Sequence, residues 1–220
     1  MVSDIMVKQA GNDVRMTAII RNSLIGVLGI LWLIGANADD IKYRDDLSYM
    51  AYNGVWKKMF NKDLDIRINA EEKTINLYID EAQGRSVILL DDKARKELVA
   101  AIEKYNRWNK KASADGVKLE KDIATIKPVW YLYYVGKKWR TFYGNDFQVR
   151  FFSQSKKIHQ FVFVFPEVST PSNENISHKI ETMYLSYKQA NALRKALAPG
   201  LIARAIAKGQ KQKVIEEGFN

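Results

Sequence analysis

Residues 64–80 read LDIRINAEEKTINLYID, and this stretch decides the fold expected for the chain. Between Leu64 and Ile68 every second residue is apolar, and the same alternation returns from Ile75 to Ile79. A period of two is typical of a strand with one buried face. The polar stretch Asn69–Thr74 lies between the two runs. We therefore predict an antiparallel pair of strands joined by a short turn.

The sequence that follows predicts a third strand and then a helix. Ser86–Leu90 is mostly apolar and follows a glycine-containing turn. Asp91 and Asp92 are both suitable N-caps, because a short side-chain oxygen can accept a free backbone N–H in the first turn. Apolar residues then recur at helical spacing as far as Trp108, and Asp115-Gly116 marks the exit loop.

Elsewhere the pattern predicts one helix near the start and a strand-rich block near the end. Apolar residues between Asp46 and Phe60 fall roughly on one helical face. The later block predicts four strands, a loop, a short strand, a helix capped by Ser186 and a last basic helix. In chain order these are Val129–Val135, Trp139–Tyr143, Phe147–Phe152, Ile158–Phe165, the loop Val168–Ser177, Thr182–Leu185, and helices carrying Leu193 and spanning Leu201–Lys208.

These elements predict an α+β fold, a mainly antiparallel sheet with two principal helices packed on one face. We expect a single α+β domain over residues 39–208 and a frayed C-terminal tail at 209–220. The strand-to-helix junctions at Leu90-Asp91 and Leu185-Ser186 are alike at an offset of 95 residues. This likeness leaves open a duplicated strand-strand-strand-helix unit. The alternative is that every such junction needs a cap and an apolar helix face.

Composition narrows the chemistry that the chain can perform. The 220 residues are 47% hydrophobic and 27% charged, which suits a globular core, and the net charge is +10. A positive surface attracts polyanions, although it also simply aids solubility. The chain has no cysteine, which excludes disulfides, thiolate metal sites and cysteine catalysis.

Residues 1–38 have the pattern of a cleavable secretory signal. Arg21 precedes a run of 12 uncharged, mostly apolar residues, 24–35, and small residues at Ala36 and Ala38 have the spacing of a cleavage site. Met16 offers an alternative start. We expect an exported chain, periplasmic or secreted, with no membrane span after cleavage. An uncleaved anchor and a buried core helix are the alternatives, but the run is shorter than a bilayer span of about 20 residues.

Residues 127–160 are the most informative stretch for binding. They carry seven basic residues, one acidic residue and ten aromatic residues. Aromatic rings beside positive charge suit stacking on bases or sugar rings together with contacts to phosphate or carboxylate groups. An ordinary sheet, with aromatic strands and lysines in its turns, has the same composition. The candidate binding residues are Trp130, Tyr134, Lys137, Lys138, Trp139, Arg140, Tyr143, Lys156 and Lys157.

Catalytic and cofactor motifs are weak. The sequence has no phosphate-binding glycine loop, no His-Glu-x-x-His and no Gly-x-Ser-x-Gly motif. His159 and His178 are isolated in the sequence, and we interpret each as a surface residue. Asp63 and Asp65 would share one strand face, at a separation that a carboxylate-dependent hydrolase could use. We expect no metal and no cofactor.

The sequence therefore favours an exported, non-enzymatic binding or cell-envelope-associated protein whose partner is an anionic polymer, an envelope component or another protein. An extracytoplasmic hydrolase acting through Asp63 and Asp65 is one alternative. A nucleic-acid-binding protein is the other, and it requires that the N-terminus is not an export signal. A basic segment over Arg194–Lys213 could also form a surface helix that contacts anionic lipid, or a helix docked on its own domain.

Overall fold

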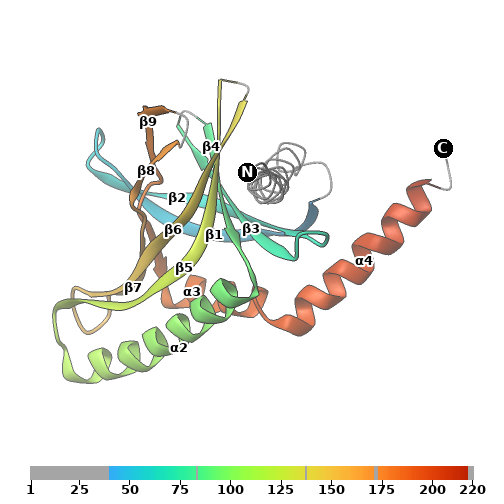
Figure 1. Ribbon diagram of the computed structural model, residues 1–220. Coiled ribbons are helices and arrows are strands. Elements are labelled where there is room, and N and C mark those ends of the chain that lie inside the picture. Colours follow the sequence, from blue (N-terminus) through green and yellow to red (C-terminus); the bar gives the residue numbers. More distant parts are fainter. Residues whose placement is uncertain (1–39, 83, 137, 171–172, 218–220) are drawn as a thin grey trace, which may run out of the picture. The chain divides into compact units, whose positions relative to one another are not determined.

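The structure, a computed structural model, describes residues 40–82, 84–136, 138–170 and 173–217. The expected signal at 1–38 therefore lies outside the described residues. Figure 1 shows the arrangement of the elements. In chain order they are β1 (Ile41–Asn53), β2 (Lys58–Asn69), β3 (Thr74–Glu81), β4 (Gly84–Leu90), α2 (Asp92–Asp115), β5 (Leu119–Val135), β6 (Lys138–Ser153), β7 (His159–Val164), β8 (Glu167–Thr170), β9 (Asn173–Lys179), β10 (Met183–Ser186), α3 (Tyr187–Ala196) and α4 (Pro199–Glu217).

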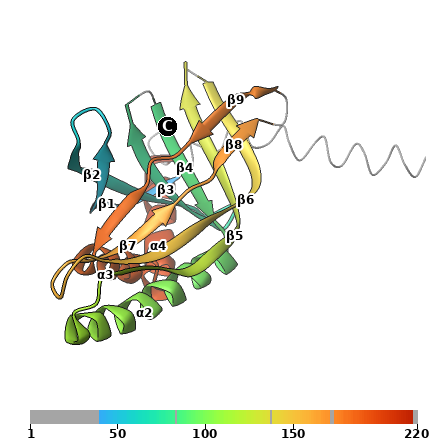
Figure 2. The same ribbon diagram turned by 90° about the vertical axis from the view of Figure 1, so that its left-hand side faces the viewer.

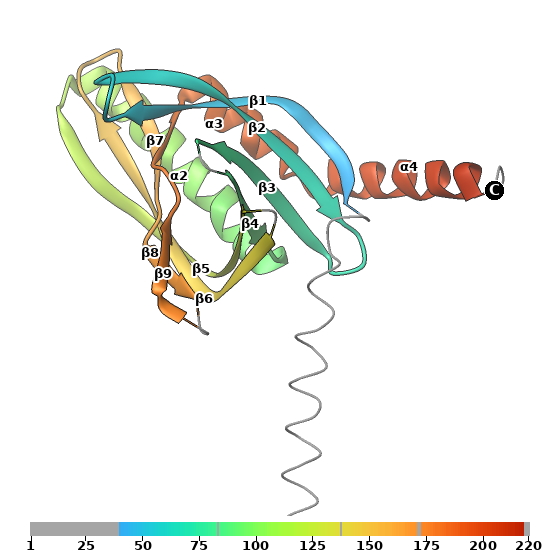
Figure 3. The same ribbon diagram turned by 90° about the horizontal axis from the view of Figure 1, so that it is seen from above.

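Within the described residues, eight strands form a closed antiparallel barrel in the order β1-β10-β7-β6-β5-β4-β3-β2. Strands β8 and β9 form a separate two-stranded hairpin between β7 and β10. Seen from above in Figure 3, α2 and α3 lie across the far end of the barrel. We call this the helix end. The opposite end, where β1 joins β2, β3 joins β4 and β5 joins β6, is the mouth.

The expected sheet with two helices packed on one face is wrong, because the sheet closes on itself. Alternation specifies one buried face for each strand, and that face can line a barrel as well as a flat sheet. Register shifts in the β1–β2 and β5–β6 pairs bend these strands and help the sheet to curl. The duplicated strand-strand-strand-helix unit is also not observed. Four barrel strands precede α2, and four more, interrupted by the β8–β9 hairpin, precede α3.

The barrel interior is filled by aromatic and aliphatic side chains. Phe147, Phe161 and Phe163 are fully buried, with ring centroids 5.4 Å apart for Phe147–Phe163 and 5.3 Å apart for Phe161–Phe163. From the helix end, Tyr105 of α2 contacts Phe161 edge-on at 5.4 Å. Residues of α2 and of the barrel strands therefore belong to one hydrophobic core. Burial of each such ring stabilises the fold by roughly 1.5–3 kcal/mol.

The two junctions between a strand and a principal helix are built as predicted. Asp91 caps α2 and accepts a hydrogen bond from the backbone N–H of Ala94 at 2.7 Å. Gly116 ends this helix in the left-handed conformation, with φ at 71°. Ser186 caps α3, and Gln189 completes the reciprocal capping box. Capping fixes where each helix leaves the barrel.

Three sequence-based elements are wrong. The expected helix over Asp46–Phe60 is instead β1, a turn and the start of β2, because Leu47, Tyr49 and Ala51 are buried in alternation. The expected break at residues 144–146 is absent, since β6 runs unbroken from Lys138 to Ser153. The expected loop at 168–177 contains most of the β8–β9 hairpin. At the C-terminal side, α4 continues beyond Lys208 to Glu217.

Candidate functional site

Three aromatic residues of the predicted binding set, Trp130, Tyr134 and Trp139, lie on the outside of the barrel. On β5, Tyr131 and Tyr133 are buried, so the alternate residues Trp130 and Tyr134 face outward, and each is 38% exposed. Tyr134 pairs in register with Trp139 on β6, and their ring centroids are 5.0 Å apart. We call Trp130, Tyr134 and Trp139 the aromatic wall.

A buried apolar cluster lies beside the aromatic wall on the same outer face of the barrel. Val87 and Leu89 of β4 and Leu132 of β5 form a cluster with Tyr78 of β3, and Trp139 packs against it. The guanidinium of Arg67 lies 4.3 Å from the centre of the Tyr78 ring. Trp139 is therefore packed against apolar neighbours, and Leu132 lies between Trp130 and Tyr134 on the same strand face.

The structure separates the predicted basic residues. Lys138 is exposed at the start of β6, where it pairs with Val135 and so projects from the opposite strand face to Trp139. Arg140 pairs with the buried Tyr133, and its Nε atom is shielded from solvent without a hydrogen-bond partner among the described side chains. Lys156 and Lys157 lie in the β6–β7 turn, beyond roughly 50 Å of strand. Lys137 and the side chain of Tyr143 lie outside what the structure describes.

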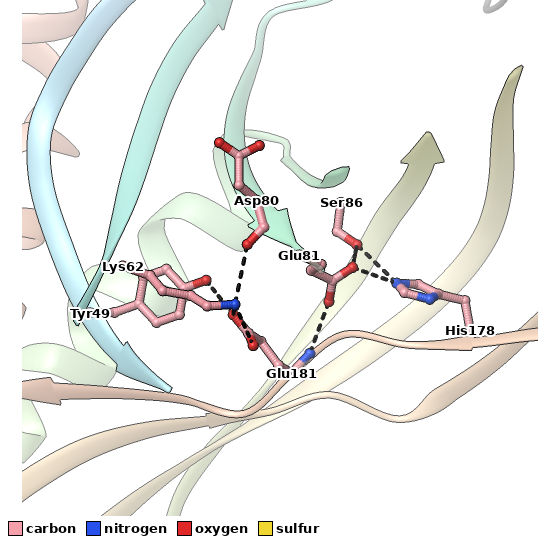
Figure 4. A network of polar contacts seen from close by, with 7 residues as sticks. All are labelled: Tyr49, Lys62, Asp80, Glu81, Ser86, His178 and Glu181. Atoms are coloured by element: carbon pink, nitrogen blue, oxygen red, sulfur yellow. Dashed lines mark hydrogen bonds and ion pairs between the residues drawn. The ribbon is translucent and has the colours of Figure 1, made fainter. Parts of the chain in front are cut away.

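A polar network that the sequence did not reveal lies at the mouth (Figure 4). Lys62 donates to both carboxylate oxygens of Glu181, at 2.6 and 2.8 Å. The hydroxyl of the buried Tyr49 also donates to Glu181, at 2.6 Å. These contacts join β1 and β2 to the segment that leads into β10. We call this group the Glu181 cluster.

A second group lies beside it and holds the β8–β9 hairpin. Ser86 donates to Glu81 Oε2 at 2.6 Å, and His178 Nε2 lies 3.0 Å from the same oxygen. The backbone N–H of Glu181 donates to Glu81 Oε1 at 3.2 Å. The His178 ring stacks on Tyr133 with centroids 3.6 Å apart. One carboxylate on β3 therefore joins β4, β9 and the segment that leads into β10.

The electrostatics of both groups follow from these contacts. Burial alone would raise the pKa of Glu81, but hydrogen bonds from His178 and Ser86 outweigh it and hold this pKa below its usual value. Burial, together with the hydrogen bond to Glu181, raises the pKa of Tyr49 far above its ordinary value. Tyr49 therefore stays protonated and remains a donor, and Glu81 stays charged and remains an acceptor.

Ser86, His178 and Glu81 resemble a catalytic triad in composition but not in geometry. In a triad the carboxylate contacts one imidazole nitrogen and the serine contacts the other. Here both contact Nε2, since Ser86 Oγ lies 2.9 Å from that nitrogen and Glu81 lies 3.0 Å from it. Ser86 is fully buried and donates its single proton to Glu81. The arrangement holds strands together and does not activate a nucleophile.

The other residues considered for chemistry occupy structural positions. Asp63 and Asp65 alternate with the buried Leu64 and so share the outer face of β2, where Asp65 forms an ion pair with Arg67 at 2.9 Å. His159 is buried, which contradicts the surface position that we expected for it. Among the residues that the structure describes, no group of three histidine, cysteine or carboxylate side chains could hold a metal ion.

A groove of about 500 Å³ lies on another part of the outer barrel. Side chains of β1, β2, β5, β6, β7 and β10 line it, and they include Tyr52, Met59 and Tyr184.

No family model, no curated protein and no solved structure matches this chain. In the described part of the chain, no helix is both long and apolar enough to cross a membrane.

Proposed function

We propose that this chain is an exported, non-enzymatic binding protein of the cell envelope, and that its aromatic wall binds an acidic polysaccharide. The observation that carries the proposal is the wall itself, in which two large rings are 38% exposed, Trp139 packs against an apolar cluster, and the exposed Lys138 is next to Trp139 in the chain. Rings of this kind stack on flat apolar ligand faces, and the ammonium group attracts carboxylates.

The geometry of the mouth supports a binding role over catalysis. Ser86, His178 and Glu81 contact one another there, and Glu81 also accepts a hydrogen bond from the backbone of Glu181. These contacts hold strands together. The basic balance of the chain, with a net charge of +10, favours an anionic ligand. Export is supported by the signal-like pattern of residues 1–38.

The test of the wall is titration of the chain with polygalacturonate, an acidic polysaccharide. We expect Trp130→Ala combined with Tyr134→Ala to weaken binding tenfold or more, because stacking on an aromatic ring contributes roughly 1–3 kcal/mol. Trp56→Ala removes an exposed tryptophan elsewhere and should leave the affinity unchanged. Equal affinities for the wall variant and the native chain would contradict the proposal.

Two further measurements separate the alternatives. Tighter binding to single-stranded DNA than to polygalacturonate would favour the nucleic-acid interpretation, and for a polyanion the affinity must fall as salt rises. N-terminal sequencing of the native protein from separate cell fractions tests export. A chain beginning at Asp39 outside the cytoplasm supports export, and an intact N-terminus in the cytoplasm contradicts it.

A further inference from the structure

The hairpin that joins β1 and β2 extends beyond the barrel wall. On β1, pairing with β10 ends at Ala51, and on β2, pairing with β3 begins at Leu64. Between these points the two strands pair only with each other in the described structure, through Asn53 and Lys58 at the tip. Figure 2 shows this hairpin standing apart from the neighbouring strands.

The tip of this hairpin exposes apolar side chains. Val55 is 86% exposed and Trp56 is 69% exposed. Behind them Tyr52, Met59 and Phe60 are also exposed. A turn at the end of a hairpin is ordinarily polar. A cluster of exposed apolar side chains instead marks a site of interaction with a protein, a membrane or a ligand.

The tip is held in shape without any partner. The side-chain oxygen of Asn53 accepts hydrogen bonds from the backbone N–H groups of Val55, at 2.9 Å, and Trp56, at 3.0 Å. Lys57 adopts the left-handed conformation with φ at 52°, which completes the reversal. Because this turn is already ordered, it would lose little conformational entropy on binding a partner.

The charged residues of the tip itself are all positive. From Asn53 to Lys62 the sequence NGVWKKMFNK has three lysines and no acidic residue. Lys62 is paired with Glu181, which leaves Lys57 and Lys58 as the cations nearest the exposed tryptophan. Tryptophan prefers the interface between headgroups and acyl chains, and lysines beside it contact anionic headgroups.

We propose that the β1–β2 tip docks the protein on an anionic lipid bilayer. Val55 and Trp56 enter the boundary between headgroups and acyl chains, and Lys57 and Lys58 contact the headgroups. The surface uses none of the residues of the aromatic wall, so polysaccharide binding and lipid binding can fail independently.

The experiment uses the full chain and exploits its lack of cysteine. An environment-sensitive fluorophore is attached to Val55→Cys and, as the matched control, to Lys156→Cys in the turn at the helix end. We expect vesicles that contain phosphatidylglycerol to shift the emission of the tip label to shorter wavelength, and brominated acyl chains to quench it. The control label should not respond. Because the label reports its own surroundings, contact of residues 1–38 with lipid cannot produce this result.

The charge requirement is tested with Lys57→Gln combined with Lys58→Gln. Each lysine near an anionic surface strengthens binding about fivefold, so without both lysines the tip label should need about thirtyfold more vesicle lipid for half of its shift. Both substitutions are exposed, and the thermal midpoint should not change. An unshifted tip label with anionic vesicles overturns the proposal. So does an equal shift with purely zwitterionic vesicles, or protection of the tip by a protein partner without any response to lipid.

Discussion

The Glu181 cluster should stabilise the point at which the barrel closes. In the described residues, β1 and β10 meet through two register pairs, Met50 with Tyr184 and Ala51 with Met183. Because this backbone pairing is short, we expect the closure of the barrel to depend on side-chain contacts between β1, β2 and the segment before β10. We therefore predict that Tyr49→Phe and Glu181→Gln both destabilise the barrel and that their effects are coupled.

The magnitude follows from burial and from the partners of the carboxylate. Tyr49 is fully buried, and its hydroxyl donates to Glu181 at 2.6 Å. A hydrogen bond to a charged group contributes about 1.5–3 kcal/mol. The Lys62–Glu181 pair has side chains 31% and 26% exposed, so solvent screening reduces its share to less than about 1 kcal/mol. We expect Glu181→Gln to lower the free energy of unfolding by about 2 kcal/mol, or roughly 4–8 °C in Tm.

The assay is urea unfolding of the native chain, the two single variants and the double variant. We expect a coupling energy of about 1 kcal/mol between Tyr49 and Glu181, because Tyr49→Phe removes their shared hydrogen bond and Glu181→Gln removes the charge that strengthens it. Tyr52→Phe makes the same chemical change at an exposed tyrosine and should leave stability unchanged. A coupling energy below about 0.3 kcal/mol would refute the assignment of this hydrogen bond to closure.

Three further predictions concern pH, packing and backbone contact. The folded-state pKa of Glu81 lies below its usual value of 4.5, so its contribution is present above that pH and is lost as pH falls through the folded value. Tm measured between pH 7 and pH 3 should therefore fall less for Glu81→Gln than for the native chain, and parallel curves would argue against this role. Phe163→Ala should cost about 3–5 kcal/mol in urea unfolding, since it empties a fully buried site, and a loss under about 1 kcal/mol would contradict the packed core. A Cβ at Gly84 would lie 2.1 Å from the carbonyl oxygen of Tyr134, so Gly84→Ala should lower Tm, whereas Gly54→Ala meets nothing within 4 Å and should not.

The sequence predicted the elements whose local signals agree with one another. Alternation from Leu64 to Ile79 gave two strands and their turn correctly, and a good N-cap at Asp91 together with helical spacing gave α2. For β1 the signals conflict, because apolar residues at 47, 50, 51 and 55 suit a helical face while those at 47, 49 and 51 suit a strand. Pairing with β2 decided the outcome, and local sequence does not contain that pairing.

Closure of the barrel and assembly of the mouth depend on contacts between residues far apart in the sequence. Local sequence patterns could not predict these contacts, and so could not predict the barrel or the polar network. Closure brings Met50 beside Tyr184, and the mouth brings Glu81 beside His178. An isolated histidine in a polar stretch gives no sign of such a partner. Ser86 gave the one sequence signal for a buried polar contact, because it is a polar residue in a mostly apolar strand and pairs with Ile79 and Tyr133. The outward direction of Trp130 and Tyr134 was not fixed either, since their strand is apolar on both faces.

The order of the strands has a consequence for folding kinetics. Most neighbouring barrel strands are also near neighbours in the sequence, so their pairings close short loops. The β1–β10 pairing instead joins residues more than 130 positions apart. We expect this pairing to form after the transition state, because closing so long a loop costs more conformational entropy than closing the short ones. Substitutions at this junction should therefore accelerate unfolding and leave the rate of refolding almost unchanged.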